Sequence, residues 1–267
     1  MTEALRVERT GSGGAVARVT LSRPEKRNAF DASLIAELRA TFSALERDSP
    51  TDLRAVVLAG EGETFCAGAD IDWMRAAMQL DVEGNEQDAM AMADMFEAID
   101  TCPVPVIARV QGAALGGGMG LCAVSDVVIA ESGARFGFTE TRLGILPAVI
   151  SPFVIAKIGE SHARALFPGG RRFDALRAQR IGLVHEVVEG AQLMERTMDL
   201  ARELANGPQV SMRLLKRTIY NAAEMTLAHS FDDIAGKTAI SDHHPDSREG
   251  VAAFRERREP KFNAWLP

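Results

Sequence analysis

Residues 104–140, VPVIARVQGAALGGGMGLCAVSDVVIAESGARFGFTE, decide the fold of this chain. The β-branched residues of 104–110 predict a buried strand, which ends at Gly112. A glycine triplet follows at 116–118, a short helix is expected over 119–123, and 127–130 predict a second strand. Glycines between a strand and a helix leave backbone N–H groups unpaired and unshielded. The stretch therefore predicts a place where a ligand approaches the backbone itself.

A second loop of the same kind precedes this stretch. Residues 65–70, FCAGAD, follow a strand expected over 53–58 and lead into a helix expected over 71–79. Two such loops can each direct one N–H donor at a single oxygen atom, which is the arrangement that stabilises an oxyanion. The glycines at 118 and 120 also resemble a dinucleotide-binding fingerprint, but Glu131 comes too early to be its ribose-binding acid.

The order of elements predicts an α/β body followed by a helical C-terminal part. In the first half we expect strands at 5–7 and 16–21 joined by a glycine turn, a helix capped by Asp31, a polar mobile loop at 81–88 and a helix at 90–100. Further on we expect helices capped at Ser151 and starting at 173–174, and a last strand at 184–188. Helices alone are expected from Gly190 onward, at 193–204, 210–220, 227–240 and 249–258.

The composition is that of an ordinary globular protein: of 267 residues, 46% are hydrophobic and 25% charged. The net charge of −7 argues against nucleic acid and anionic membranes as main partners. The three cysteines, Cys66, Cys102 and Cys122, have no metal-binding or disulfide spacing. We see no signal peptide, and the longest apolar stretch, 143–158, contains two prolines. These features predict a cytoplasmic protein without membrane insertion or bound metal.

Several motifs in combination resemble the crotonase superfamily, the enoyl-CoA hydratase/isomerase family. The resemblance covers nearly the whole chain. It is carried by RPEKRNA (23–29), GEGETFCAGAD (60–70), VQGAALGGGMGL (110–121), SDVVIA (125–130), ARFGFTETRLGILP (134–147) and EGVAAFRERREPKF (249–262).

The resemblance implies an α/β fold, a spiral of β-β-α units over residues 1–190, and a helical region over 191–267 that builds a homotrimer or a dimer of trimers. It implies an acyl-CoA or enoyl-CoA substrate and no separate cofactor, since CoA is part of the thioester. The oxyanion-hole amides of the family fall on Ala69 and Gly117. The residues expected near CoA are Lys26, Arg27, Cys66, Ala67, Ala69, Asp70, Ile71 and Arg257. Cys66 has no His or Asp that would activate it, and we interpret its side chain as packing.

The acid and base of the family are two glutamates, of which this chain retains one. Glu140 matches the second, whereas Gly120 stands at the position of the first and offers no carboxylate. A buried glutamate beside a thioester can have a raised pKa and carry a proton to or from carbon. With Glu140 alone, the simplest chemistry is double-bond isomerisation.

A further stretch favours water addition instead. TETRLGILPAVISPF (139–153) resembles bacterial hydratases of branched or carboxylated enoyl-CoAs, the methylglutaconyl-CoA type of leucine degradation, which also tend to lack the first glutamate. The leading hypothesis is therefore an enoyl-CoA hydratase, with a Δ3,Δ2-enoyl-CoA isomerase next. A CoA-thioester hydrolase, a decarboxylase or a CoA-binding protein without catalysis remains a further alternative.

Overall fold

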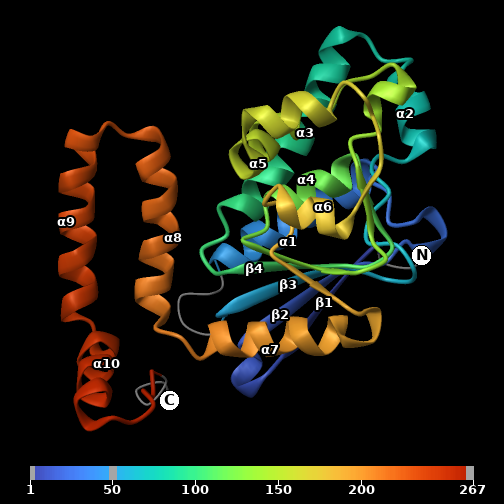
Figure 1. Ribbon diagram of the computed structural model, residues 1–267. Helices are drawn as coiled ribbons and strands as arrows, with labels where there is room; N and C mark the ends of the chain where they lie inside the picture. Colours follow the sequence, from blue (N-terminus) through green and yellow to red (C-terminus); the bar gives the residue numbers. More distant parts are fainter. Residues whose placement is uncertain (1–3, 48–52, 263–267) are drawn as a thin grey trace. The chain divides into compact units, whose positions relative to one another are not determined.

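The computed structural model describes residues 4–47 and 53–262, which fall into two compact units, one up to Ala201 and one from Arg202 onward. The first unit is built on a six-stranded sheet of order β1-β2-β3-β4-β6-β9 (Figure 1). The strands are β1 (Leu5–Thr10), β2 (Val16–Leu21), β3 (Ala55–Gly60), β4 (Val106–Val110), β6 (Val127–Glu131) and β9 (Glu186–Val188). β1 and β2 form the expected antiparallel hairpin, and every later neighbour pairs in parallel.

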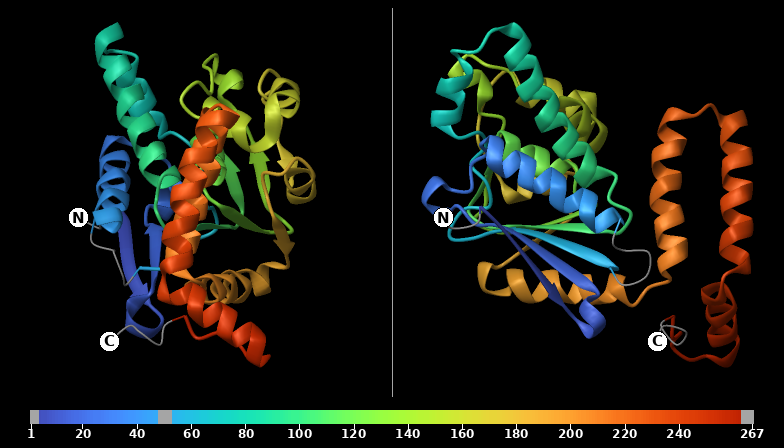
Figure 2. Two further views of the ribbon diagram at one scale, coloured as in Figure 1. Left: turned by 90° about the vertical axis from the view of Figure 1, so that its left-hand side faces the viewer. Right: turned by 180° about the vertical axis from the view of Figure 1, so that it is seen from behind.

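The central strands are apolar on both faces, as parallel strands covered by helices must be. All six residues of β3 are buried, and four of the five in β4 are. Helices α1 and α3 lie on one side of the sheet and α7 on the other (Figures 1 and 2). Their bounds are Ala32–Arg47 for α1, Val82–Asp100 for α3 and Leu193–Ala205 for α7. The sheet is therefore a rigid base for the loops that leave its strands.

A second, three-stranded sheet was not expected from the sequence. Its strands, in the order β5-β7-β8, are β5 (Ala113–Leu115), β7 (Arg135–Gly137) and β8 (Phe173–Asp174). β5 and β7 pair in parallel, which brings the segment before the glycine triplet beside the segment before Glu140. Strands of two or three residues carry too little alternation to be detected by periodicity.

The helices that position the loops are α2 (Ile71–Ala77), α4 (Gly117–Ala123), α5 (Ser151–Leu166) and α6 (Ala175–Arg180), and all four begin close to where the sequence predicts. Two predictions about helix starts nevertheless differ from the structure. The prediction of a mobile loop at 81–88 is wrong, because α3 already begins at Val82, where the Asp81 side chain accepts a hydrogen bond from the Gly84 N–H at 2.8 Å. Ser151 was expected to be a cap, but it is the first residue of α5 and makes no capping bond.

The second unit is helical, with α8 (Gln209–Glu224), α9 (Leu227–His243) and α10 (Pro245–Glu256). α8 and α9 are joined by a hydrogen bond between the hydroxyls of Ser211 and Ser241 at 2.9 Å. Beyond α10, Arg258 forms an ion pair with Glu249 at 2.6 Å, which lowers the pKa of that carboxyl to about 2. In the part of the chain that the structure describes, no helix is long and apolar enough to cross a membrane.

Candidate functional site

The two glycine-containing loops meet beside the second sheet. Cys66 pairs with Ala114 as an isolated parallel bridge, in which its N–H donates to the Ala113 carbonyl at 3.1 Å and its carbonyl accepts from the Leu115 N–H at 3.0 Å. Gly68 then passes so close that a side chain there would lie 2.9 Å from the Leu115 carbonyl oxygen. The loop at 65–70 is therefore fixed against the segment that leads into the glycine triplet.

The Ala69 N–H is free to bind a ligand because of how its loop is paired. Phe30 forms a parallel bridge with Ala69, but its hydrogen bonds go to the neighbours: its N–H donates to the Gly68 carbonyl and its carbonyl accepts from the Asp70 N–H, each at 2.7 Å. In parallel pairing of this kind, the bridged residue directs its own N–H away from the partner strand. The Ala69 amide is therefore aimed at the side opposite Phe30.

The Gly117 N–H is free for a different reason. Gly117 is the first residue of α4, so no carbonyl one turn earlier can accept from its amide. A Cβ at this position would lie 2.5 Å from the Phe30 ring, so only glycine fits. The preceding residue, Gly116, has a φ of 51°, which also favours glycine. Neither Ala69 nor Gly117 donates its N–H to another of the described residues.

Both amides border one cavity of about 370 Å³, named here the inner cavity. Its lining comes from both loops, from α2 and α3, and from the segment 139–150. The residues are Phe30, Ala67, Gly68, Ala69, Trp73, Met74, Ala77, Asn85, Asp88, Ala89, Met92, Gly116, Gly117, Thr139, Glu140, Leu143, Ile145, Leu146, Pro147, Ala148, Val149 and Ile150. An apolar cavity with a few convergent polar groups is the common form of a small-molecule site.

Glu140 is one of two carboxyl groups in this lining. Its Oε1 atom would lie 3.1 Å from a Cβ built on Gly116, which places the carboxyl next to the glycine triplet. Its Oε2 atom is buried and makes no hydrogen bond within the described residues. Burial raises the pKa of Glu140, partly opposed by a hydrogen bond from its own backbone amide. A carboxyl with a raised pKa and a free oxygen is suited to take up and release a proton.

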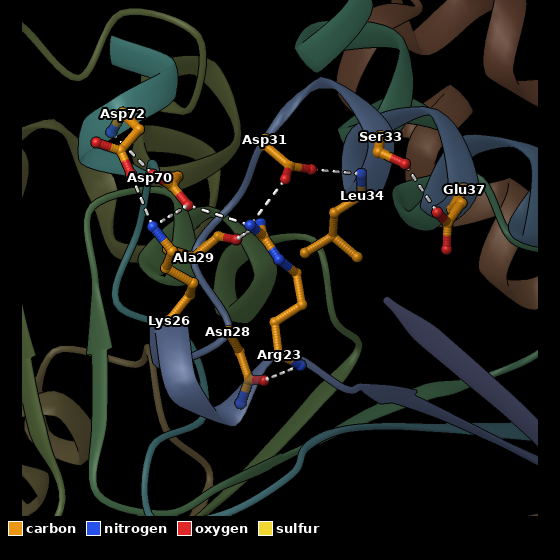
Figure 3. A network of polar contacts seen from close by, with 10 residues as sticks. All are labelled: Arg23, Lys26, Asn28, Ala29, Asp31, Ser33, Leu34, Glu37, Asp70 and Asp72. Atoms are coloured by element: carbon orange, nitrogen blue, oxygen red, sulfur yellow. Dashed lines mark hydrogen bonds and ion pairs between the residues drawn. The ribbon is translucent and has the colours of Figure 1, made fainter. Parts of the chain in front are cut away.

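A polar network ties the loop at 23–29 to the loop at 65–70 (Figure 3). The Arg23 guanidinium donates to the Ala29 carbonyl at 2.7 Å and to the Asp70 carboxylate at 3.1 Å, and it pairs with Asp31 at 2.8 Å. Asp70 in turn caps α2 by accepting from the Asp72 N–H at 2.8 Å. Because Asp70 follows Ala69 directly, Arg23 positions the loop that carries this amide.

Asn28 links the loop at 23–29 to the segment that leads into the loop at 65–70. Its side-chain amide donates to the carbonyls of Glu61 at 2.9 Å and Thr64 at 2.7 Å, and its carbonyl oxygen accepts from the Arg23 N–H. The side chain is fully buried, and its φ of 55° is one that asparagine tolerates. Every hydrogen-bonding atom of the Asn28 amide is engaged in fixing the approach to Phe65.

The residues expected near CoA are in different situations. Lys26 is exposed, and its ammonium is paired with Asp72 at 2.7 Å and Asp70 at 3.7 Å, whereas Arg27 is exposed at the end of the same turn. Ala67 borders the inner cavity, Asp70 is buried as a cap, and Ile71 is largely exposed. Cys66 is fully buried, and burial raises the pKa of its thiol to about 12. Arg257 lies in the second unit, at the end of α10.

Gly120 does not border the inner cavity but is packed beneath it. A Cβ on Gly120 would lie 2.5 Å from Cγ2 of Ile150 and 2.7 Å from the Phe96 ring. Ile150 and Phe96 are themselves buried. The position at which the resemblance predicts the first glutamate is therefore filled by these two side chains, so a carboxylate introduced there has no room.

Sequence reasoning missed Trp73 and Met74 of α2 and Asp88 of α3 in the lining. Trp73 and Met74 follow the Asp70 cap, and Asp88 and Met92 lie one turn apart on α3. Asp88 fell in a segment expected to be a loop, so its placement on one face with Met92 could not be seen. The four-residue spacing of Asp88 and Met92, about one helical turn, is the signal that would have placed Asp88 on this face.

The charge of the inner cavity is one-sided. Asp88 and Glu140 contribute carboxyl groups, whereas none of the lining residues in the described chain carries a cation. The site therefore combines two N–H donors for a developing oxyanion, one carboxyl group suited to move a proton, and an apolar chamber without a counter-ion for a bound acid.

Comparison with known proteins gives consistent matches over the length of the chain. The family model described as enoyl-CoA hydratase/isomerase matches residues 11–264. Over 253 residues, the chain is 31% identical to the 1,2-epoxyphenylacetyl-CoA isomerase of Escherichia coli, covering 92% of this chain and 94% of that protein.

Two solved structures resemble the chain in fold as well as in sequence. The enoyl-CoA hydratase of Mycobacterium smegmatis matches with a TM-score of 0.91 at 30% identity, covering 98% of this chain and 99% of that one. AtuE of Pseudomonas aeruginosa matches with a TM-score of 0.91 at 36% identity, covering 97% and 99% of the two chains.

Proposed function

Because the chain belongs to the enoyl-CoA hydratase/isomerase family, we propose that it is an enoyl-CoA hydratase that adds water to a 2-enoyl-CoA. Its fold is the α/β crotonase fold, with β-sheets and C-terminal helices, and its substrate class is the acyl-CoA thioester. One observation carries the proposal: a buried oxygen of Glu140 stands at a cavity bordered by the amides of Ala69 and Gly117, and none of the three has a hydrogen-bond partner among the described residues.

The two amides provide the electrostatic part of catalysis. When a nucleophile adds to the β-carbon of an enoyl thioester, negative charge moves to the thioester oxygen. Donors already aimed at that oxygen stabilise the charge without reorganising, and removal of one such donor costs about 3–4 kcal/mol in other enzymes. In this chain the N–H groups of Ala69 and Gly117 would serve as these donors. Since both are backbone groups, their position depends on the pairing of the two loops.

Glu140 would carry the proton in both halves of the reaction. As the water oxygen bonds to the β-carbon, the Glu140 carboxylate takes one proton from that water. The resulting carboxylic acid then gives the proton to the α-carbon as the enolate collapses. The net change is addition of one water across the double bond, and Glu140 returns to its starting state. A raised pKa suits the first step, because it makes the carboxylate a stronger base toward the water.

A Δ3,Δ2-enoyl-CoA isomerase is the second candidate, and the surroundings of Gly120 favour it. Isomerisation needs one group that removes a proton from the α-carbon and returns it to the γ-carbon, which Glu140 can do alone. Hydratases of the family generally use a further glutamate, the first of the pair, at the position of Gly120. Here Ile150 and Phe96 fill the space that its side chain would need. The two reactions differ in whether water is held beside the β-carbon.

The acyl group is proposed to be uncharged, either straight or branched. The resemblance of residues 139–153 allowed a carboxylated acyl group of the methylglutaconyl-CoA type. Such a group would place its own carboxylate beside Asp88 and Glu140, with no cation among the described lining residues to pair with it. Burying an unpaired charge is costly, so the carboxylated substrate is the less favoured of the two.

The CoA end and the assembly are proposed by family resemblance. Arg27 is better suited than Lys26 to bind the phosphates, because Lys26 is already paired with Asp70 and Asp72. We propose Arg257 as the corresponding cation of the C-terminal region, and 191–267 as the region that builds a homotrimer or a dimer of trimers. Ala67, Asp70 and Ile71 would border the CoA, while Cys66 packs beneath it.

Incubation of the purified protein with a small panel of enoyl-CoAs in heavy water tests the proposal. Mass spectrometry of the products should show a 3-hydroxyacyl-CoA carrying deuterium at the α-carbon. A migrated double bond with deuterium exchange would point to the isomerase instead. Release of free CoA, or binding without any product, would overturn both in favour of a hydrolase or a CoA-binding protein.

A further inference from the structure

A second cavity, of about 440 Å³, adjoins the inner cavity and is named here the outer cavity. It lies along α1 and α3, and small side chains make up most of its wall: Ala32, Ala36, Ala40, Ser43 and Ala91. Two residues line both cavities, Trp73 from α2 and Asp88 from α3. Trp73 and Asp88 are thus the residues at which the two linings meet.

From this placement we propose that Trp73 and Asp88 form a partition that limits the length of the acyl group. The inference rests on the proposed function, because it takes the inner cavity to be the acyl site. With the partition intact, only short acyl groups fit. Without the indole ring, the inner cavity would open into the outer one, and longer chains would be accepted.

The partition has a steric and an electrostatic part. Trp73 presents the largest side chain of either lining and packs against the hydrophobic core, so its ring is held in place. Asp88 has no ion pair with a cation among the described residues, since the nearby Arg39 is paired with Asp94 at 3.1 Å. An apolar chain that reached Asp88 would remove water from a charged carboxylate, which is unfavourable.

The outer cavity would give a long acyl chain apolar surface that the chain cannot reach while the partition is in place. Its alanines and Ile35 present apolar surface with few side-chain atoms in the way. Each methylene that becomes buried there should tighten binding about fourfold, the equivalent of about 0.8 kcal/mol. Affinity as a function of chain length therefore reports directly on whether the wall is present.

Calorimetric titration of the full-length protein with saturated acyl-CoAs, from butyryl- to dodecanoyl-CoA, tests the partition without any turnover. In the wild type, affinity should rise with length and then level off. In Trp73→Ala it should keep rising, so that the ratio of dodecanoyl-CoA to butyryl-CoA affinity is at least about tenfold higher than in the wild type. Asp88→Asn should tighten only the chains beyond the plateau.

Met78→Ala is the matched control, because Met78 ends the same helix, is 69% exposed and borders neither cavity. It should give the wild-type profile. Trp73→Phe, with its smaller ring, should be intermediate and decides the question if Trp73→Ala does not fold. An unchanged plateau in both Trp73 variants, or no plateau in the wild type, would overturn the partition. Failure of the wild type to bind any acyl-CoA would instead overturn the proposed function.

Discussion

Glu140 is held in an environment that favours its neutral form. Its Oε2 atom is buried without a partner in the described structure, and burial raises the pKa of the carboxyl. An ionised carboxylate in such a place costs folding free energy. The residue proposed to carry the proton is therefore also a source of instability at neutral pH, as is common at functional sites.

Glu140→Gln should stabilise the fold, and more so at high pH. Between the ordinary pKa of glutamate and the raised pKa of Glu140, the folded protein binds more protons than the unfolded chain, so the free energy of unfolding of the wild type falls as pH rises. The variant lacks this loss. Denaturant unfolding at about pH 5 and about pH 8 should show a larger gain at the higher pH. The exposed Glu25→Gln is the control, and an equal gain at both pH values would contradict the burial argument.

Gly120 stands where the missing carboxylate was expected, and buried side chains pack closely around it. Because a Cβ would approach Ile150 and Phe96 to 2.5 and 2.7 Å, Gly120→Ala should destabilise the protein by about 1–3 kcal/mol through overpacking. Gly133→Ala, where the nearest atom is 3.9 Å away, should change stability little. Equal thermal unfolding temperatures for the two variants would show that the packing at Gly120 is loose.

At the scale of single residues, the sequence predicts which backbone groups are free but not how closely side chains from distant segments pack. The free amide of Gly117 follows from its place at a helix start, which the glycine triplet predicts. The close packing around Gly120 depends on Phe96 and Ile150, from α3 and from the segment before α5, and local spacing could not reveal it. A glutamate at position 120 would restore the missing carboxylate, but Phe96 and Ile150 leave that side chain no room.

At the scale of elements, the long helices and buried strands were predictable and the short pairings were not. β3 is a continuous apolar run and β4 is apolar except for Arg109, and α1 has the expected Asp31 cap, whose carboxylate accepts from the Leu34 N–H at 2.9 Å. The bridges Phe30–Ala69 and Cys66–Ala114 join residues far apart in sequence and involve single residues. They fix the geometry of the site, yet nothing in the local pattern marks them.

Arg23→Lys tests how strongly one side chain positions the loop of Ala69. A lysine keeps the charge but cannot reach Asp31, Asp70 and the Ala29 carbonyl together. We expect a loss of about 1–3 kcal/mol in stability, with kcat falling because the Ala69 amide is less well held. Arg164→Lys, in an exposed pair with Glu160, should change neither. Full turnover in Arg23→Lys would show that the network does not position the site.

At the scale of the whole molecule, the second unit carries more apolar surface than a separate helical unit can bury. Leu215 and Ile219 of α8, Leu227 and Phe231 of α9, and Phe254 of α10 are exposed in the single chain. Large exposed apolar faces of this kind usually mark protein–protein contacts. This agrees with the proposed role of the region 191–267 in assembly.

Light scattering coupled to size-exclusion chromatography measures the assembly directly. We expect the mass of a trimer or of a dimer of trimers at micromolar protein. Leu215→Glu with Phe231→Glu should lower the mass, because charges replace two of the exposed apolar side chains. A monomer of the wild type under these conditions would contradict the proposal, as would an unchanged mass for the variant. From sequence, both the assembly and its number of subunits rested on the family resemblance.

The central claim is that Glu140 carries the proton at a thioester held by two backbone amides. Turnover of a 2-enoyl-CoA by Glu140→Gln, compared with the wild type at equal acyl-CoA saturation, tests it most directly. The account predicts a fall in kcat of about 10²–10⁴-fold, the usual contribution of a positioned acid–base group. The affinity for a saturated acyl-CoA should stay nearly constant, because the amides of Ala69 and Gly117 are untouched. Full activity in Glu140→Gln would contradict the account and place the chemistry elsewhere in the molecule.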